Sequence, residues 1–290
     1  MPLPTILITG ANGQLGKELR NLEPSFPKYQ FLFLSREDMP VHHFELVRNF
    51  FEIRRPAFCI NCAAYTAVDR AESEPELAFL VNGEAVGVLA EICKLFKCRF
   101  LHISTDYVFD GRSSLAYRET DPTDPINTYG ASKLRGEQMA FQKNSDSIVI
   151  RTSWLYSSYG HNFVRTMIRL MKEREEINVV SDQFGSPTYA ADLAGAIMHI
   201  IRDLNWVPGI YHYSNTGSTS WYEFALAIRE MAGLTCKVNP IPASEYPTPA
   251  KRPSFSILST DQIRKVFHLS IPDWKQSLSA CIEKIIRQDP

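Results

Sequence analysis

The sequence predicts an α/β fold in which a doubly wound parallel sheet carries helices on both faces, with a smaller α/β lobe built mainly from the C-terminal half. Short apolar runs alternate with amphipathic stretches through the first half of the chain. These runs are apolar at consecutive positions, as in parallel strands covered on both faces. A glycine-rich turn, ITGANGQLG, ends the first run and opens the first amphipathic stretch. That strand–turn–helix order is typical of doubly wound sheets.

Five strands are expected in the first half, over residues 5–9, 30–35, 57–62, 99–104 and 147–152. Between the second and the third, Phe44, Val47 and Phe51 recur at helical spacing. Ser73 and Glu76 have the spacing of a capping box, and the intervening proline suits a first helical turn. A helix is therefore expected from there to about residue 96. This β–α alternation predicts parallel strands joined by right-handed crossovers.

The second half of the chain is less regular. Helices are expected over 161–174, 189–204, 221–231 and 273–287, and a proline-rich stretch over 239–253 separates the last two. We therefore divide the chain into a main domain, residues 1–155, and a smaller lobe formed mainly by residues 156–290. Some segments of that lobe are expected to return to the main sheet.

Three glycines stand at three-residue intervals in the turn after the first strand. Gly10 suits a tight turn, Gly13 lets the backbone approach a pyrophosphate, and Gly16 lets the helix pack closely on the sheet. The helix N-terminus adds free N–H groups and the positive end of a dipole. The pattern predicts a Rossmann-type dinucleotide site, lined here by Gly10, Asn12, Gly13, Gln14, Leu15 and Gly16.

The residues after the second strand bear on the choice of cofactor. Ser35 and Arg36 come first, and a guanidinium suits a 2′-phosphate, which favours NADPH. Asp38 follows, and a carboxylate here could hold an unphosphorylated ribose, so NADH stays possible. The other cofactor contacts expected from this segment and from the end of the third strand are Met39, Ala63, Ala64 and Tyr65.

Tyr129 and Lys133 lie four positions apart in NTYGASKLRGE, so they share one face of a helix. The ordinary pKa of a phenol, about 10, is too high for ready proton exchange at neutral pH. A neighbouring ammonium stabilises the phenolate and lowers that pKa. Thr105 adds a hydroxyl after the fourth strand, at the end of the sheet where α/β folds bind ligands. The tyrosine–lysine spacing alone also fits two ordinary helix residues.

Seven stretches together resemble the extended short-chain dehydrogenase/reductase family, and within it the dTDP-4-dehydrorhamnose reductases. They are GANGQLG, AAYTAVDRAESEPE, STDYVFDG, YGASKLRGE, RTSWLY, DQFGSPT and TPAKRP, and they span nearly the whole chain. The resemblance implies that the first domain binds NAD(P)H and that the second lobe mainly binds a nucleotide sugar. It also implies hydride transfer to the C4 keto group of dTDP-4-dehydro-L-rhamnose, which gives dTDP-L-rhamnose.

The same resemblance implies roles for individual residues. Tyr129 would donate the proton, Lys133 would assist it and hold a cofactor ribose, and Thr105 would hydrogen-bond the reacting oxygen and touch the sugar nucleotide. Further substrate contacts are implied at Asp106, Trp154 and Arg252. Without the resemblance, the tryptophan would fit a core position and the arginine an exposed loop.

Two other functions share these motifs. A nucleotide-sugar 4-epimerase uses the same tyrosine and lysine but keeps a tightly held NAD, whereas Arg36 favours an NADPH that exchanges. A non-catalytic regulatory subunit of the methionine adenosyltransferase type has the same fold, and retention of Tyr129 does not by itself prove turnover. A sugar-nucleotide dehydratase is disfavoured, because Tyr107 stands where the related dehydratases place a glutamate.

Composition narrows the range of partners. A formal net charge of -1 gives no basis for binding nucleic acid or an anionic membrane. The N-terminus does not resemble a signal peptide, and no apolar run approaches the ~20 residues of a membrane span, so a cytoplasmic protein is expected.

No metal site is expected. Cys59 and Cys62 form a C-x-x-C, but residues three apart on a strand point to opposite faces, which favours core positions over a redox or zinc pair. Glu18 matches a position where some family members bind a divalent ion at a dimer contact. The later carboxylate run of those members is reduced here to Asp192, which makes Glu18 a weak candidate. A homodimer stays possible.

Overall fold

The main sheet determines where a ligand can bind. The structure, a computed structural model, describes residues 3–203 and 205–288. Within them, six strands form one parallel sheet. In spatial order these are β10 (Gly209–Tyr213), β5 (Ile148–Thr152), β4 (Arg99–Thr105), β3 (Phe58–Asn61), β1 (Thr5–Thr9) and β2 (Gln30–Leu34). The chain order reverses between β1 and β3, so a crevice is expected at their carboxyl ends.

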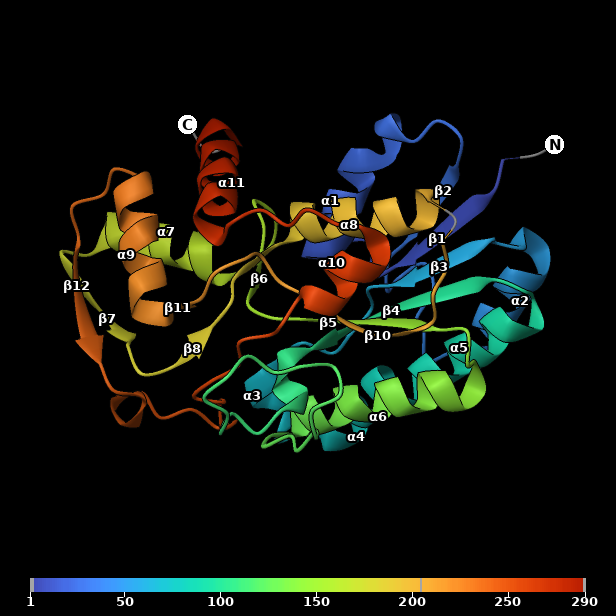
Figure 1. Cartoon of the computed structure of the whole chain (residues 1–290), viewed down its shortest axis with the longest axis horizontal. Coiled ribbons are helices and arrows are strands. Elements are labelled where there is room, and N and C mark those ends of the chain that lie inside the picture. The colour runs from blue at the N-terminus through green and yellow to red at the C-terminus, as the bar shows by residue number, and fades with distance from the viewer. Residues whose placement is uncertain (1–2, 204, 289–290) are drawn as a thin grey trace.

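Helices cover both faces of this sheet (Figure 1). On one face lie α1 (Gln14–Leu22), α8 (Ala190–Arg202) and α10 (Asp261–Phe267), and on the other lie α2 (Phe44–Arg54), α5 (Ala85–Leu95) and α6 (Thr128–Lys143). Side chains of β1 alternate between the two layers: Ile6 and Ile8 pack toward α1 and α8, and Leu7 packs toward α2 and α5. The continuous apolar runs of the sequence therefore have the predicted cause, burial on both faces.

The second half of the chain contributes to both parts of the molecule. A separate core joins α7 (Phe163–Glu173), α9 (Trp221–Met231) and α11 (Trp274–Gln288) around Phe224 and Leu278. Three short strand pairs border it: β6 (Leu155–Tyr156) with β9 (Thr188–Tyr189), β7 (Glu176–Val180) with β12 (Lys237–Ile241), and β8 (Phe184–Gly185) with β11 (Thr219–Ser220). In contrast, β10, α8 and α10 pack in the main sheet and its layers.

Short helices connect these elements. They are η1 (Glu23–Ser25), α3 (Val68–Ala71), α4 (Pro75–Phe79), the π-helical turn η2 (Leu80–Glu84), η3 (Asp106–Val108) and η4 (Ala243–Glu245). The predicted capping box is wrong: α4 begins after Glu74 without a side-chain cap, and the Ser73 hydroxyl instead donates to Arg70 O. The expected long helix up to residue 96 is α4, η2 and α5 in succession, ending at Leu95.

The other predicted bounds agree with the structure to within about two residues, apart from Leu204, which lies outside the described residues. Cys59 lies within β3 and Cys62 just beyond its end, and both thiols are free. Over residues 3–203 and 205–288, no helix combines the length and the apolar character that crossing a membrane requires.

Candidate active site

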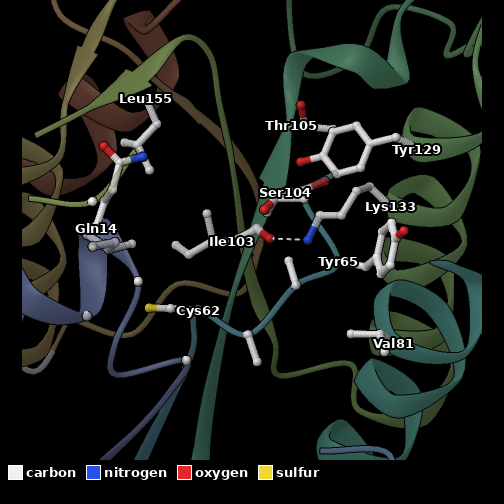
Figure 2. A pocket seen from close by; sticks show the side chains of 18 of the residues that line it. Gln14, Cys62, Tyr65, Val81, Ile103, Ser104, Thr105, Tyr129, Lys133 and Leu155 are labelled. Atoms are coloured by element: carbon white, nitrogen blue, oxygen red, sulfur yellow. Dashed lines mark hydrogen bonds between the residues drawn. The ribbon is translucent and has the colours of Figure 1, made fainter. Parts of the chain in front are cut away.

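A cavity of about 770 Å³ opens at the carboxyl ends of β1, β3 and β4. Figure 2 shows Thr105, Tyr129 and Lys133 gathered on one side of it, with Gln14 and Leu155 on the opposite side. Residues of the smaller lobe also reach the cavity. It is the crevice that the strand order predicts.

The glycine loop has the geometry that a pyrophosphate site requires. Gly10 has φ +65°, and a Cβ there would lie 2.7 Å from the backbone N of Ala63. A Cβ on Gly16 would lie 2.7 Å from Ala11 Cα, so this glycine allows α1 to pack against the turn. Within the described chain, the N-cap of α1 is Gly13, which offers no side-chain cap, and the first turn of the helix has no acidic residue. Its N–H groups therefore suit an anion.

In the segment after β2, the structure distinguishes between the two candidate contacts to the ribose, Arg36 and Asp38. Arg36 is exposed and lines the cavity. The Asp38 carboxylate instead accepts a hydrogen bond from Ser35 N at 2.9 Å, and this bond lowers the pKa of Asp38. Asp38 is not among the described residues that line the cavity. The guanidinium is therefore better placed than the carboxylate to meet a ribose substituent.

The α6 N-terminus places the tyrosine and the lysine. Asn127 caps this helix by accepting from Gly130 N at 2.7 Å, and Tyr129 follows in the first turn. Burial raises the pKa of Tyr129 to about 12, although its hydrogen bond with Thr105 acts the other way. The predicted lowering of the phenol pKa by the ammonium is therefore absent from this structure. Lys133 Nζ donates instead to Ile103 O at 2.6 Å.

Lys133 is buried inside the fold rather than on the helix surface. Only 2% of it is exposed, and its Nζ also lies 3.2 Å from His102 Nε2. Burial lowers its pKa to about 8. The lysine is thus able to exchange a proton near neutral pH, which a surface lysine is not.

Next to Thr105, Asp106 presents an unusual carboxyl group. It is 2% exposed, and its Oδ2 has no hydrogen-bond partner among the described residues. Burial raises the pKa of Asp106 to about 7. Its Oδ1 accepts from the Thr105 hydroxyl at 3.1 Å. A buried polar atom without a partner at a cavity wall is a candidate ligand contact.

Two tryptophans form another wall. Trp154 has φ +46°, which is uncommon for a bulky residue. Its ring stacks on Trp221 with the ring centroids 3.5 Å apart. A Cβ on Gly185 would lie 2.4 Å from Trp154, so the glycine makes room for the ring. Sequence reasoning missed Trp221, because its helical position in α9 gave no sign that it would reach the crevice.

The structure brings most of the predicted residues together. Of those predicted, the residues that line the cavity are Gly10, Asn12, Gly13, Gln14, Leu15, Gly16, Ser35, Arg36, Met39, Ala63, Ala64, Tyr65, Thr105, Asp106, Tyr129, Lys133 and Trp154. Arg252 is not among the described lining residues; its guanidinium binds both carboxylate oxygens of Asp69, at 2.8 and 3.0 Å.

Glu18 is 1% exposed and is not among the described residues that line this cavity. It accepts from the Ser157 hydroxyl at 2.6 Å, and Lys284 Nζ lies 3.9 Å from its other oxygen. Across the part of the chain that the structure describes, no cluster of three or more His, Cys, Asp or Glu side chains could hold a metal ion.

Comparison with known proteins identifies the family. A family model described as the RmlD substrate binding domain matches residues 4–287. The chain is 42% identical to dTDP-4-dehydrorhamnose reductase from Burkholderia thailandensis, over 98% of this chain and 99% of the relative, and 40% identical to that from Escherichia coli K12, over 97% of each. A crystal structure of dTDP-4-dehydrorhamnose reductase from Bacillus anthracis in complex with NADP matches with a TM-score of 0.94 at 42% identity, covering 98% of this chain and 100% of that one. The chain therefore belongs to the dTDP-4-dehydrorhamnose reductase (RmlD) family of extended short-chain dehydrogenases/reductases.

Proposed function

We propose that this protein reduces the C4 keto group of dTDP-4-dehydro-L-rhamnose with NADPH and releases dTDP-L-rhamnose. The relatives above carry the reductase name, and the Bacillus anthracis structure contains NADP. The observation that carries the proposal is one cavity with a phosphate-binding loop on one side and Thr105, Tyr129 and Lys133 on the other.

Bound NADPH would supply the hydride that reduces C4. The chain's own task is to bind the carbonyl oxygen and protonate it as it becomes an alkoxide. With a pKa of about 12, Tyr129 keeps its proton at neutral pH and can give it to a stronger base. The Thr105 hydroxyl, which donates to Asp106 Oδ1 in this structure, lies at the same wall and would turn to donate to the substrate oxygen; a donor aimed at developing charge contributes about 3 kcal/mol.

The remaining walls suit a deoxy sugar. The free Oδ2 of Asp106 can accept a hydrogen bond from a sugar hydroxyl. The stacked rings of Trp154 and Trp221 offer an apolar surface to a sugar face. On the cofactor side, the α1 N-terminus would hold the pyrophosphate and Arg36 the 2′-phosphate.

The test is an NADPH oxidation assay with dTDP-4-dehydro-L-rhamnose, followed by the fall in NADPH absorbance. We expect turnover in the wild type and a loss of roughly 100- to 10,000-fold in Tyr129→Phe, because general acid catalysis contributes about that much. NADPH binding, measured by its fluorescence, should change little. Tyr246→Phe, which removes an exposed phenol, serves as the control.

Full turnover by Tyr129→Phe would exclude this tyrosine as the proton donor. A wild type that binds NADPH but oxidises none would exclude the reductase and favour a regulatory role. Inversion of a sugar hydroxyl without net cofactor oxidation would identify an epimerase.

A further inference from the structure

Three buried polar side chains lie in one row across the main sheet. The register pairs Thr9 of β1 with Asn61 of β3, and Asn61 with His102 of β4. Each is at most 1% exposed. Residues paired in register project from the same face of a sheet. The row continues to Lys133 of α6, whose Nζ lies 3.2 Å from His102 Nε2.

At the Thr9 end of this row, the hydrogen bonds show which atom of Asn61 is the acceptor. The Thr9 hydroxyl donates to Asn61 Oδ1 at 2.6 Å, and the Ala63 N–H donates to the same oxygen at 3.3 Å. The amide nitrogen of Asn61 therefore faces His102 and donates to its Nδ1 at 3.0 Å. Burial and the nearby Lys133 lower the pKa of His102 well below its usual range, and the opposing backbone carbonyl of Asn61 does not offset this, so the ring is neutral. A neutral imidazole that accepts at Nδ1 carries its hydrogen on Nε2.

This tautomer places an N–H against the amine of Lys133. An ammonium has three donors and no lone pair, so it cannot accept a hydrogen bond from Nε2–H. A neutral amine can accept from His102 and still donate to Ile103 O, 2.6 Å away. The contact between Nζ and His102 Nε2 is therefore a hydrogen bond only when Lys133 has lost its proton.

We infer that His102 is a positioning residue for the proposed reaction: its Nε2–H, oriented by Asn61, favours the unprotonated form of Lys133 and so makes this lysine a proton donor to Tyr129. Tyr129 passes its hydroxyl proton to the reduced oxygen and becomes a phenolate. The Lys133 ammonium then protonates the phenolate and is left as the amine that accepts from His102. Solvent restores the ammonium. The proton path rests on the proposed function, whereas the charge state inferred for Lys133 does not.

The other ionisable groups around Lys133 do not reverse its preference for the unprotonated form. The Glu137 carboxylate, one turn further along α6, is held by Arg151 of β5 at 2.7 Å and by Ser104 of β4. Burial raises the pKa of the Cys62 thiol, so that group is neutral. Tyr65, which lies beside Lys133 in Figure 2, and Tyr129 and Asp106 are further titratable groups that line the same cavity. Burial lowers the pKa of Lys133 to about 8 against the opposing effect of Glu137, so this shift has the same direction as the tautomer argument.

The first experiment needs no mutation and no turnover. Long-range proton–nitrogen NMR of the histidine rings, recorded without added cofactor, should show His102 as the Nε2–H tautomer. A titration followed at the Lys133 side-chain carbons should have its midpoint near 8, where the pKa lies. The Nδ1–H tautomer, or a midpoint at the ordinary lysine value of about 10.4, would overturn the inference.

The second experiment removes the donor. His102→Asn keeps an acceptor for Asn61 but has no group at the Nε2 position, so the Lys133 midpoint should rise by about one pH unit. If the enzyme is active when Lys133 is an ammonium, the midpoint of the alkaline limb of the kcat/KM profile should rise by the same amount. Val149→Ala, at the next position in the row, is the control and should leave both midpoints unchanged.

The outcomes separate the two proposals. A uniform drop in activity with unmoved midpoints would mean that His102 is only structural, and the inference would fail. A Lys133 midpoint that rises in a protein without reductase activity would keep the tautomer argument and refute the proposed function.

Discussion

Arg36 is the residue on which cofactor choice is expected to depend. It is exposed at the cavity, while the competing carboxylate of Asp38 is occupied by Ser35 N. We predict that Arg36→Ala weakens NADPH binding by roughly 10- to 100-fold, because a charge-assisted hydrogen bond is worth about 1.5–3 kcal/mol. NADH binding should change much less. Fluorescence titration with each cofactor gives the two dissociation constants.

Arg54→Ala is the matched control, since Arg54 is an exposed arginine in the last turn of α2 and does not line the cavity within the described residues. If Arg36→Ala left the ratio of the two dissociation constants unchanged, another group would have to bind the 2′-phosphate.

For individual residues, the sequence predicted which side chains come together at the cavity but not which charged or polar partners they bind. Strand ends converge in any doubly wound sheet, so Gly10 and Thr105 could be placed together from their positions alone. The partner of Arg252 could not, because Asp69 lies 183 residues away. The same holds for Lys133: its helical spacing pointed to Tyr129, and its strongest contacts are Ile103 and His102, in the strand beneath.

Among the elements, α6 depends on glycine for its close packing. A Cβ on Gly136 would lie 2.1 Å from Asn82 O, in the π-helical turn η2. Gly136→Ala should therefore destabilise the protein by about 1–3 kcal/mol, since either α6 or η2 must shift. Urea unfolding at neutral pH gives the change in the free energy of unfolding.

Gly195 provides the matched helical control. It is exposed in α8, and a Cβ there would meet nothing within 4 Å. Gly195→Ala should stabilise the protein by about 0.5–1 kcal/mol through the intrinsic preference for alanine in helices. Equal effects from the two substitutions would show that contact with η2 is not what constrains Gly136.

The η2 turn also shows where element prediction fails. The proline of the first turn correctly predicted helix up to about residue 96, but no local signal indicated the extra residue in one turn. The buried side chain of Asn82 bonds both Tyr65 N and Ser132 Oγ there, at 2.8 and 2.9 Å. These partners come from other elements, so the irregularity depends on tertiary contacts that a local pattern does not contain.

At the scale of the whole molecule, the stability of the fold at acid pH depends on buried groups whose pKa values are shifted in opposite directions. Burial lowers the pKa of His212 to about 3 and that of His102 well below its usual range. Their stabilising effect is complete above the unfolded value of about 6.5 and is lost as the pH falls. Asp106 acts in the opposite direction: its pKa is raised to about 7, so its contribution is lost as the pH rises from about 4 through 7.

His102 and His212, which stay neutral when folded, make the protein less stable in acid, whereas Asp106 and Glu119, whose pKa values are raised by burial, partly offset this loss. His212→Asn removes one of these histidines, so its free energy of unfolding at pH 5 relative to pH 7 should exceed that of the wild type by about 2 kcal/mol. His43→Asn, which changes an exposed histidine, should keep the wild-type dependence. Urea unfolding of the three proteins at both pH values measures this. Parallel dependences for His212→Asn and the wild type would mean that His212 is protonated in the folded state, against its contacts with Arg151 Nη1 and Tyr117 O.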